Sequence, residues 1–556
     1  MKKKSVSSGL PYRLYNKTPL SGNCANFILS LNSDFHMNKI LSISLMLMFC
    51  VASWSQPLNS EDIDKLVVRT METFNVPGIA VAVIKDDRVV HMKGYGVSSI
   101  ATGKKTDENT LFAIASNSKA FTSAALGILV DEGKLTWETK VTDIIPEFRL
   151  YNSYVTEDFN IKDLLTHRSG MGLGAGDLML WPDSSVFTKE EIIHNLRYLK
   201  QTSSFRTKYD YDNLLYLVAG EVVARVSGQG WDEFVESRIM KPLGMGNSAA
   251  SLNRVRDRSN MIDAHVPVNG VLQVVPMYAS TLLDPAGGIM SSVSDMTKWA
   301  MMQLNRGKYG EGNKSQLLSD KVHREMWTPQ TVIPVRNPGP YRVHFSAYGL
   351  GWGLSDVAGY LQASHTGGLA GIVTQVTLIP ELKIGIIVFT NQQDGAAFTA
   401  ITNTIKDGYL GIKGNDWIKT LKENGDKGVA EAKRITDEIW AKIEAQRSKS
   451  SMPVNNAIYT GTYSDIWFGD IVISDESGKL RFRSVKSPKM RGEMLYYTGN
   501  TFVVKWDDRS MDADAWAVFT LDREGKAAAF TMDAISPLTD FSYDFQDLNP
   551  KRKEVK

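Results

Sequence analysis

The chain has 556 residues, of which 43% are hydrophobic and 22% charged. This is the composition of a globular protein, and the chain is too long for one average domain. Its formal net charge is +2, and the part after residue 56 holds 57 basic and 60 acidic residues. The near balance excludes both an extended basic face for nucleic acid and a polyanionic protein, so no nucleic-acid partner is expected.

The first segment has the pattern of a signal peptide. Met37-Asn-Lys39 is a short positive start, and 40–52 is an apolar run of signal-peptide length. Small residues at Ser53 and Ser55 predict cleavage before Gln56. Met37 is then the natural initiator, with residues 1–36 upstream of it. Because the run is too short for a comfortable membrane span, we expect a periplasmic or secreted bacterial protein without a stable membrane anchor.

Both cysteines lie in this leader, at Cys24 and Cys50. A mature chain that starts at Gln56 therefore has no cysteine, which excludes disulfides and thiolate chemistry. Phe49, directly before Cys50, is too bulky for a lipoprotein signal.

Two hairpins are predicted far apart in the chain. An amphipathic stretch at 63–74 precedes alternating runs at 79–84 and 89–95, and this pattern recurs at 374–379 and 383–389. About three hundred residues of mostly helical and loop character separate the two hairpins. We predict an α+β fold in which one antiparallel sheet is built from both ends of the domain, flanked by helices, with a helical insertion between them.

The last part of the chain has a different character. Residues 415–449 are charged and helical, and the serines that follow predict a linker. Short alternating strands are then expected at 470–474, 479–483, 501–506, 515–521 and 527–532. They predict a small antiparallel barrel or sandwich, and we favour an all-β barrel. The predicted organisation is an upstream segment and signal peptide (1–56), a hydrolase domain (57–413), a helical linker (414–455) and a β-barrel domain (456–556).

Ser116-Asn-Ser-Lys119 lies where the apolar run 111–115 gives way to a helical pattern at 120–131. A serine and a lysine three residues apart project from one face of a helix. A serine hydroxyl is a poor nucleophile and needs a base, and an amine can serve only if its pKa falls well below ~10.4. On these four residues alone, a helix cap with a solvated lysine is the simpler interpretation.

Two further stretches bear on this pair. Tyr211 and Asn213 precede a helical run from 214, where a phenol can relay a proton and an amide can orient a substrate or Lys119. The second stretch, His365-Thr366-Gly367-Gly368, comes just before the second hairpin. Glycines on a strand let a ligand approach the backbone, whose N–H groups can face an oxyanion. Taken singly, each stretch is equally well a helix start or a tight turn.

The three stretches Ser116–Lys119, Tyr211–Asn213 and His365–Gly368 are called the first, second and third box below. Four more short motifs surround them, at 164–171, 242–245, 285–292 and 348–352. In their order and spacing these motifs and boxes resemble those of the serine beta-lactamase-related family of the class C type, which includes penicillin-binding proteins, D-aminopeptidases and esterases. The resemblance covers roughly residues 60 to 410 and implies a beta-lactamase/transpeptidase-like fold.

The resemblance also implies the site residues. Ser116 would be the acylated nucleophile, Lys119 its base, and Tyr211 the proton relay to the leaving group. Asn213 would contact substrate and lysine, and His365 would open the third box, catalytic with those three. Thr366, Gly367 and Gly368 would bind substrate, with the N–H groups of Ser116 and Gly368 as the oxyanion hole, whose loss typically costs ~10²–10³ in rate.

His365 departs from the family pattern, which usually has lysine at this position. Lysine is a permanent cation suited to a substrate carboxylate, whereas histidine, with an ordinary pKa of ~6.5, is mostly neutral at pH 7. The expected substrates therefore shift toward esters, neutral amides or peptides.

The remaining histidines show no zinc-ligand spacing, so no metal and no cofactor is expected. His167 belongs to the family motif at 164–171, and we expect it to be structural. The C-terminal segment resembles the lipocalin-like barrel that follows this hydrolase domain in some relatives. Its role, whether packing, oligomer contacts or shaping of substrate access, stays open.

The leading hypothesis is a secreted serine hydrolase that acts through a Ser116 acyl-enzyme on an ester, amide or peptide. One alternative is an acyltransferase that passes the acyl group to an alcohol or amine. A site lined by apolar residues such as Trp181 or Trp352 would favour an apolar acceptor over water. The other alternative is a non-catalytic, penicillin-binding-like protein. The expected partner is a small-molecule or peptide substrate, with oligomerisation left open.

Overall fold

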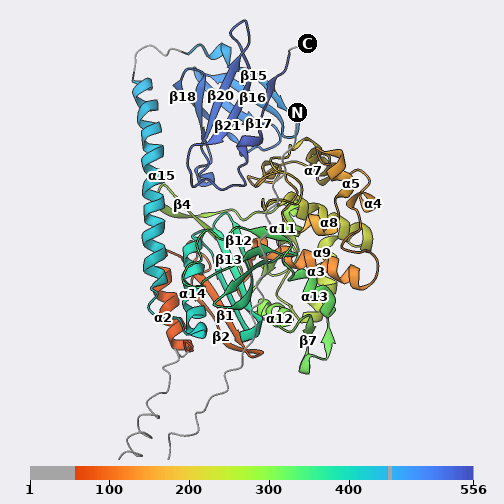
Figure 1. Cartoon of the computed structure of the whole chain (residues 1–556). Coiled ribbons are helices and arrows are strands. Elements are labelled where there is room, and N and C mark those ends of the chain that lie inside the picture. The colour runs from red at the N-terminus through yellow and green to blue at the C-terminus, as the bar shows by residue number, and fades with distance from the viewer. Residues whose placement is uncertain (1–56, 449–453, 555–556) are drawn as a thin grey trace, which may run out of the picture. The chain divides into compact units, whose positions relative to one another are not determined.

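The computed structural model describes residues 57–448 and 454–554, and Figure 1 shows their helices and strands. The predicted signal peptide and the serine-containing stretch 449–453 lie outside the described residues. In the part of the chain that is described, no helix has both the length and the apolar character needed to cross a membrane.

The larger sheet has eight antiparallel strands in the order β2-β1-β14-β13-β12-β11-β10-β9. Their bounds in that order are Arg88–Gly96, Gly78–Lys85, Ile384–Thr390, Ile372–Ile379, Tyr360–Leu369, Gly353–Val357, Ser346–Tyr348 and Thr331–Ile333. The first hairpin pairs with the second through β1 and β14, where Val81 lies opposite Val388. The predicted sheet built from both ends of the domain is therefore confirmed.

Both faces of this sheet are buried. Alternate residues of β1 belong to two different apolar clusters, Ala80 and Ala82 to one and Val81 and Val83 to the other. Helices α2 (Ser60–Phe74) and α14 (Gly395–Leu410) pack on one face and α12 (Val293–Leu304) on the other. A sheet covered on both sides needs apolar residues at every position, which explains the continuous apolar runs of β1 and β14.

A helical layer lies between β3 and β9 in the chain and surrounds α3 (Ser118–Asp131). Helix α3 is buried at every residue from Ser118 to Leu129, and Phe121 stacks on Trp299 with ring centroids 3.9 Å apart. Helices α8 (Leu214–Ser227) and α11 (Asp284–Gly287) pack against α3. A helix without a polar face is typical of a domain centre, so its Ala- and Leu-rich sequence reflects complete burial.

The other helices of the layer are short: α4 (Val141–Ile144), α5 (Ser153–Asp158), α6 (Ile161–Leu164), α7 (Lys189–Asn195), α9 (Trp231–Val235), α10 (Lys241–Leu243) and α13 (Asp320–Met326). Three two-stranded sheets join its segments: β3 (Phe112–Ala113) with β6 (Met290–Ser291), β4 (Ala264–Val268) with β5 (Val271–Val275), and β7 (Lys308–Tyr309) with β8 (Ser315–Gln316). This layer is the predicted helical insertion.

The C-terminal strands form a closed barrel, which decides between the predicted barrel and sandwich. Its strands, β15 to β22, are Gly461–Asp465, Gly469–Glu476, Lys479–Ser484, Arg491–Thr498, Thr501–Trp506, Ala515–Leu521, Ala527–Ala534 and Lys551–Arg552. Strand β22 closes the barrel by pairing with both β15 and β21. Large aromatic residues such as Phe482 and Phe530 fill the interior, with ring centroids 6.3 Å apart.

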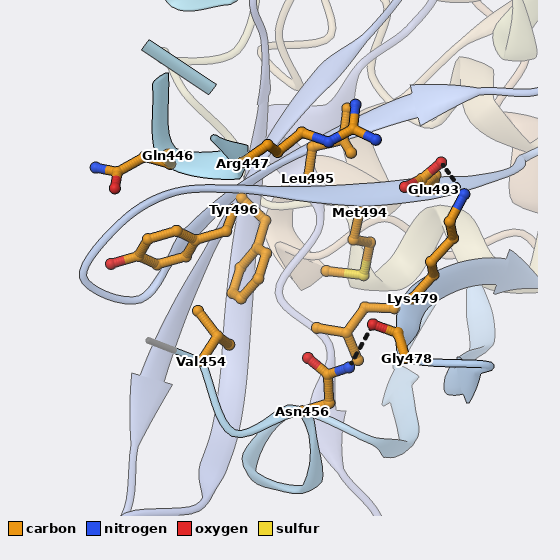
Figure 2. Close-up of a pocket in the computed structure, with 12 residues that line it drawn as sticks. Gln446, Arg447, Val454, Asn456, Gly478, Lys479, Glu493, Met494, Leu495 and Tyr496 are labelled. Carbon is orange, nitrogen blue, oxygen red and sulfur yellow. Dashed lines mark hydrogen bonds and ion pairs between the residues drawn. The ribbon is translucent and has the colours of Figure 1, made fainter. Parts of the chain in front are cut away.

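Helix α15 (Trp417–Arg447) lies in the chain between the domain of the eight-stranded sheet and the barrel. Near its start Ile418 joins the apolar cluster of α2 and α14, and near its end Ile439 and Ile443 pack against barrel residues. The last turn of α15 and the barrel rim enclose a hollow of about 180 Å³ (Figure 2). The apolar residues that this charged helix buries are thus those that contact its two neighbours.

Candidate active site

Ser116 lies in a single 3-10 turn (Ala115–Asn117) that leads directly into α3. Ile114, just before the turn, donates its N–H to the carbonyl of Ile289 at 2.9 Å. The Asn117 side chain donates to the hydroxyl of Thr374 on β13, also at 2.9 Å. The turn is therefore fixed to the sheet and to the strand before α12, and Ser116 remains partly exposed.

Lys119 points from the first turn of α3 toward Ser116 and is fully buried. Its Nζ lies 3.2 Å from Ser116 Oγ, 2.7 Å from Asn213 Oδ1 and 3.1 Å from the carbonyl oxygen of Ala286. Two of these partners are oxygens that can only accept. A neutral amine has two N–H donors and one lone pair. When Asn213 and Ala286 take the two donors, the lone pair faces the Ser116 hydroxyl.

Burial lowers the pKa of Lys119 to about 7, and the carboxyls of Asp177 and Asp212 oppose part of this shift. Desolvation disfavours the ammonium form of a lysine. A large fraction of Lys119 is therefore the free amine near neutral pH, as a base requires. The simple interpretation of a capped helix with a solvated lysine is wrong for this residue, because the structure buries it completely.

Asn213 immediately precedes α8 and links Lys119 to a residue that the sequence did not single out. Its Nδ2 donates to Asp177 Oδ2 at 2.7 Å, which turns its Oδ1 toward Lys119. Asp177 is fully buried, and burial together with the Asp212 carboxyl raises its pKa well above the ordinary range. No spacing pattern in the sequence connects Asp177 with Asn213, since 36 residues separate them.

Tyr211 contacts both members of the predicted pair. Lys119 Nζ lies 4.7 Å from the centre of its ring, and the Ser116 hydroxyl opposes part of the rise of the pKa of Tyr211. Burial nevertheless raises the pKa of Tyr211 well above the ordinary value. The phenol therefore keeps its proton at neutral pH, so it can donate a proton but is a poor base.

His365 lies on β12, with hydrogen bonds at both ring nitrogens. Nδ1 faces the carbonyl of Thr366 at 2.5 Å, and Nε2 faces the hydroxyl of Tyr348 at 2.7 Å. A carbonyl only accepts, so Nδ1 carries the hydrogen and Nε2 accepts from Tyr348. Burial and the nearby Lys119 lower the pKa of His365 to about 3. His365 is thus neutral at pH 7, and it lies 6.3 Å from the Tyr211 ring, centroid to centroid.

The two glycines after Thr366 have different surroundings. A Cβ on Gly367 would lie 2.3 Å from the carbonyl oxygen of Ile114 and 2.9 Å from Cβ of Ala115. A Cβ on Gly368 would meet nothing within 4 Å. Gly367 therefore permits the close approach of β12 to the Ser116 turn, whereas Gly368, the next residue on the strand, points to the opposite face, where there is open space. Thr366 is exposed at the same edge.

His167 is surrounded by aromatic rings. Its ring centroid lies 4.2 Å from that of Tyr211, 4.6 Å from Tyr348 and 5.7 Å from Tyr209. Its Nδ1 accepts the N–H of Asp212 at 3.0 Å, so its hydrogen is on Nε2. The residue expected to be structural thus supports the ring of Tyr211 and the backbone next to Asn213.

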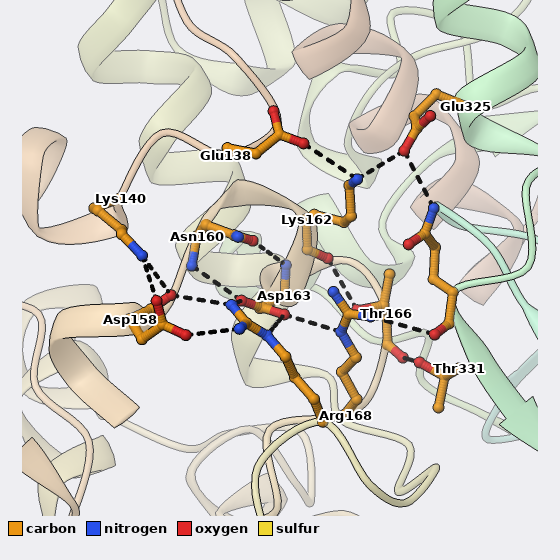
Figure 3. A network of polar contacts seen from close by, with 12 residues as sticks. Glu138, Lys140, Asp158, Asn160, Lys162, Asp163, Thr166, Arg168, Glu325 and Thr331 are labelled. Atoms are coloured by element: carbon orange, nitrogen blue, oxygen red, sulfur yellow. Dashed lines mark hydrogen bonds and ion pairs between the residues drawn. The ribbon is translucent and has the colours of Figure 1, made fainter. Parts of the chain in front are cut away.

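A polar network next to His167 holds this part of the site together (Figure 3). The buried carboxylate of Asp163 accepts from Arg168 Nε at 2.9 Å and from Arg206 Nη2 at 2.6 Å. The chain from Arg206 to Tyr211 is joined to the same region by the N–H of Asp210, which donates to the carbonyl of His167 at 2.9 Å. The network therefore ties the segment that carries Tyr211 to helix α6.

The structure thus brings Ser116, Lys119, Tyr211 and Asn213 together and places the third box at the side of the Ser116 turn. Trp352 is 1% exposed and packs on Trp327 in the interior, so it does not line an open site. Within residues 57–448 and 454–554 no cluster of three or more histidine, cysteine or carboxylate side chains is arranged to hold a metal ion.

Residues 63–408 match the sequence model of the family described as Beta-lactamase, and residues 446–552 match a domain of unknown function, DUF3471. The unguisins hydrolase ungD' of Aspergillus campestris is 27% identical over 420 residues, which is 72% of this chain and 75% of that protein. The protein flp of Staphylococcus aureus is 24% identical over 338 residues, 60% of this chain and 63% of that protein.

Solved structures show the same fold. The octameric penicillin-binding protein homologue from Pyrococcus abyssi has a TM-score of 0.58 at 21% identity, covering 86% of this chain and 98% of that one. A class C beta-lactamase has a TM-score of 0.52 at 18% identity, covering 64% of this chain and 96% of that one. At these identities the likeness concerns the fold.

Proposed function

Because the chain belongs to the beta-lactamase family, we propose that it is a secreted serine hydrolase that forms an acyl-enzyme on Ser116 from an ester, amide or peptide substrate. The observation that carries this proposal is the environment of Lys119. Its amine is fully buried, has a pKa of about 7, and has two carbonyl acceptors besides the Ser116 hydroxyl. This is the environment that an amine needs to act as a base at neutral pH.

In the first half-reaction Ser116 Oγ attacks the substrate carbonyl carbon, and its proton passes to Lys119 Nζ. The tetrahedral intermediate then loses its leaving group, which takes a proton through Tyr211, and Lys119 restores the proton of the phenol. In the second half-reaction water attacks the ester carbonyl of the acyl-enzyme, and its proton returns to Ser116 along the same groups. Tyr211 suits the acid role because burial keeps it protonated.

The developing oxyanion would be stabilised by backbone N–H groups of Ser116 and Gly368. The close approach of Gly367 to Ile114 supports this assignment, because it brings the backbone of the third box next to the Ser116 turn. Donors of this kind act without reorganisation and are typically worth ~10²–10³ in rate each.

The neutrality of His365 bears on the substrate class. With a pKa of about 3 and both ring nitrogens in hydrogen bonds, His365 supplies no cation for a substrate carboxylate. We therefore favour esters, neutral amides and peptides over penicillins. The name of the fungal relative, a hydrolase, supports water as the acceptor rather than an alcohol or amine.

The proposal is tested by intact-mass measurement of acyl-enzymes with a panel of esters, D-amino acid amides, acyl thioesters and beta-lactams. We expect a mass increase equal to the acyl group with at least one ester or amide, and none with Ser116→Ala. Adding alcohol acceptors during turnover separates hydrolysis from acyl transfer. Equal turnover by wild type and Ser116→Ala would contradict the acyl-enzyme mechanism, and efficient labelling by penicillin would contradict the substrate class.

A further inference from the structure

The C-terminal barrel contributes an aromatic residue to the candidate active site. Phe541, in the loop after β21, packs edge-on against the ring of Tyr211, with centroids 5.8 Å apart and planes at 83°. Its side chain is still 39% exposed, and Tyr211 is itself partly exposed. A ring that contacts the predicted proton donor and stays partly exposed presents its remaining surface next to that donor.

Gly174 lies between the backbone of Tyr211 and Phe541. Gly174 donates its N–H to the carbonyl of Tyr211 at 2.8 Å. A Cβ at this position would lie 2.6 Å from the carbonyl oxygen of Phe541 and 3.0 Å from its ring. Gly174 also has φ of +69°, a conformation that favours glycine. Phe541 is therefore in direct contact with the segment that borders Tyr211.

The loop that carries Phe541 is anchored three residues later. The fully buried carboxyl of Asp544 accepts the N–H groups of Gly176 at 2.6 Å and of Leu178 at 2.9 Å. The hydroxyl of Ser542 opposes a small part of the rise that burial and Asp212 cause in the pKa of Asp177. Since Asp177 holds Asn213, the same loop is connected to the partners of Lys119.

We infer that Phe541 is a specificity-determining residue of the substrate site, a wall against which an apolar or aromatic leaving group packs. The inference rests on the proposed function, in which Tyr211 gives its proton to the leaving group. A group that receives this proton must lie beside Tyr211, and Phe541 is the apolar surface there. Aromatic rings prefer edge-to-face or offset contact with one another, which a half-exposed Phe541 can offer to a second ring.

The test compares two acetate esters that share the acyl group, 2-naphthyl acetate and ethyl acetate, with wild type and Phe541→Ala. We expect KM for the naphthyl ester to rise about ten times more than KM for the ethyl ester, in line with the discrimination of apolar pockets. Phe541→Tyr, which keeps the ring, should retain the wild-type selectivity. Phe345→Ala is the matched control. Phe345 lies just before β10, is also 39% exposed, and donates its backbone N–H to Asp356.

Binding to Ser116→Ala gives a readout that does not depend on turnover. We expect Phe541→Ala in that background to weaken binding of 2-naphthyl acetate about tenfold in calorimetry. Hydrolysis of both esters with unchanged selectivity in Phe541→Ala and Phe541→Gln would overturn the inference and leave the proposed function intact. If Phe541→Ala weakens binding of the naphthyl ester but the wild type hydrolyses neither ester, the role of Phe541 in binding is supported and the proposed hydrolase activity is contradicted. The second variant, Phe541→Gln, covers the case that the alanine variant does not fold.

Discussion

Lys119 on α3 donates a 2.7 Å hydrogen bond to the side chain of Asn213 at the start of α8, across 94 residues of sequence. This contact joins α3 to the start of α8 at the candidate active site. Asn213 is held by Asp177, so the amide oxygen, and not the amide nitrogen, faces the amine. The direction in which Lys119 can accept a proton is thereby restricted to the side of Ser116.

The pH dependence of turnover follows from the pKa of Lys119. We expect kcat/KM to rise with pH through a limb near 7, because protonated Lys119 has no lone pair to accept the Ser116 proton. His365 adds no limb above pH 5, since its pKa is lowered to about 3.

Substitution of Asp212 tests its contribution to the pKa of Lys119. The carboxyl of Asp212 raises the pKa of Lys119, so Asp212→Asn should move the limb to lower pH while its Oδ1 can still accept from Leu215. Rates measured from pH 5 to 9 check both expectations. A limb near the pKa of free lysine would contradict the lowered pKa of Lys119, and a limb that Asp212→Asn does not move would show that it does not belong to Lys119.

Substitution of His365 tests the origin of the substrate preference. His365→Lys puts a cation where the wild type has a neutral ring, and a charged hydrogen bond to a carboxylate is worth about 1.5–3 kcal/mol. We expect the preference for carboxylate-bearing over neutral esters to rise by about tenfold or more, measured as a ratio of kcat/KM values.

His365→Asn is the control for that variant, because it keeps a neutral side chain that can donate and accept. Its ratio should stay close to that of the wild type. If the lysine variant shows no gain for anionic esters, the first position of the third box does not determine the charge preference.

The two glycines of the third box form a matched pair. Gly367→Ala places a methyl group 2.3 Å from the carbonyl of Ile114, so the strand or the Ser116 turn must shift. We expect a loss of about 1–3 kcal/mol in stability, typical of overpacking, and about a hundredfold loss in kcat from misplacement of Ser116.

Gly368→Ala meets open space, so its stability should stay within about 0.5 kcal/mol of the wild type. Its methyl group points to the face of β12 opposite the Ser116 turn, so KM should stay close to that of the wild type. Chemical denaturation and ester kinetics measure the two effects. Equal losses of stability in both variants would contradict the different surroundings of the two positions.

The network in Figure 3 predicts a difference between two aspartates. Asp163 is fully buried between Arg168 and Arg206, and its removal leaves the largely buried Arg168 without its carboxylate partner and Arg206 with Asp158 alone. Asp163→Ala should cost about 3–5 kcal/mol in the free energy of unfolding. Asp158 also pairs with Arg206 but is 34% exposed, so Asp158→Ala should cost at most about 1 kcal/mol. Urea denaturation measures both, and similar losses would show that burial of Asp163 is unimportant.

The hairpins at both ends of the hydrolase domain could be predicted because continuous apolar runs interrupted by turn residues are local patterns. The short strands β9 and β10 were not expected, since three residues are too few to show an alternation. The choice between barrel and sandwich depended on β22, a strand of two residues whose pairing with β15 and β21 has no sequence signature. Closure of a sheet is a long-range property, and local periodicity does not contain it.

The sequence by itself determined the α+β class, the order of the boxes, and the pairing of Ser116 with Lys119, because a spacing of three residues places two side chains on one helix face. Only the tertiary structure decided that Lys119 loses its charge near neutral pH, since desolvation depends on how α8 and α11 pack around α3. The tertiary structure also showed the hydrogen bonds that keep His365 neutral, and the contact of Phe541 with Tyr211 across 330 residues of chain. Such contacts arise from packing, and no local pattern in the chain encodes them.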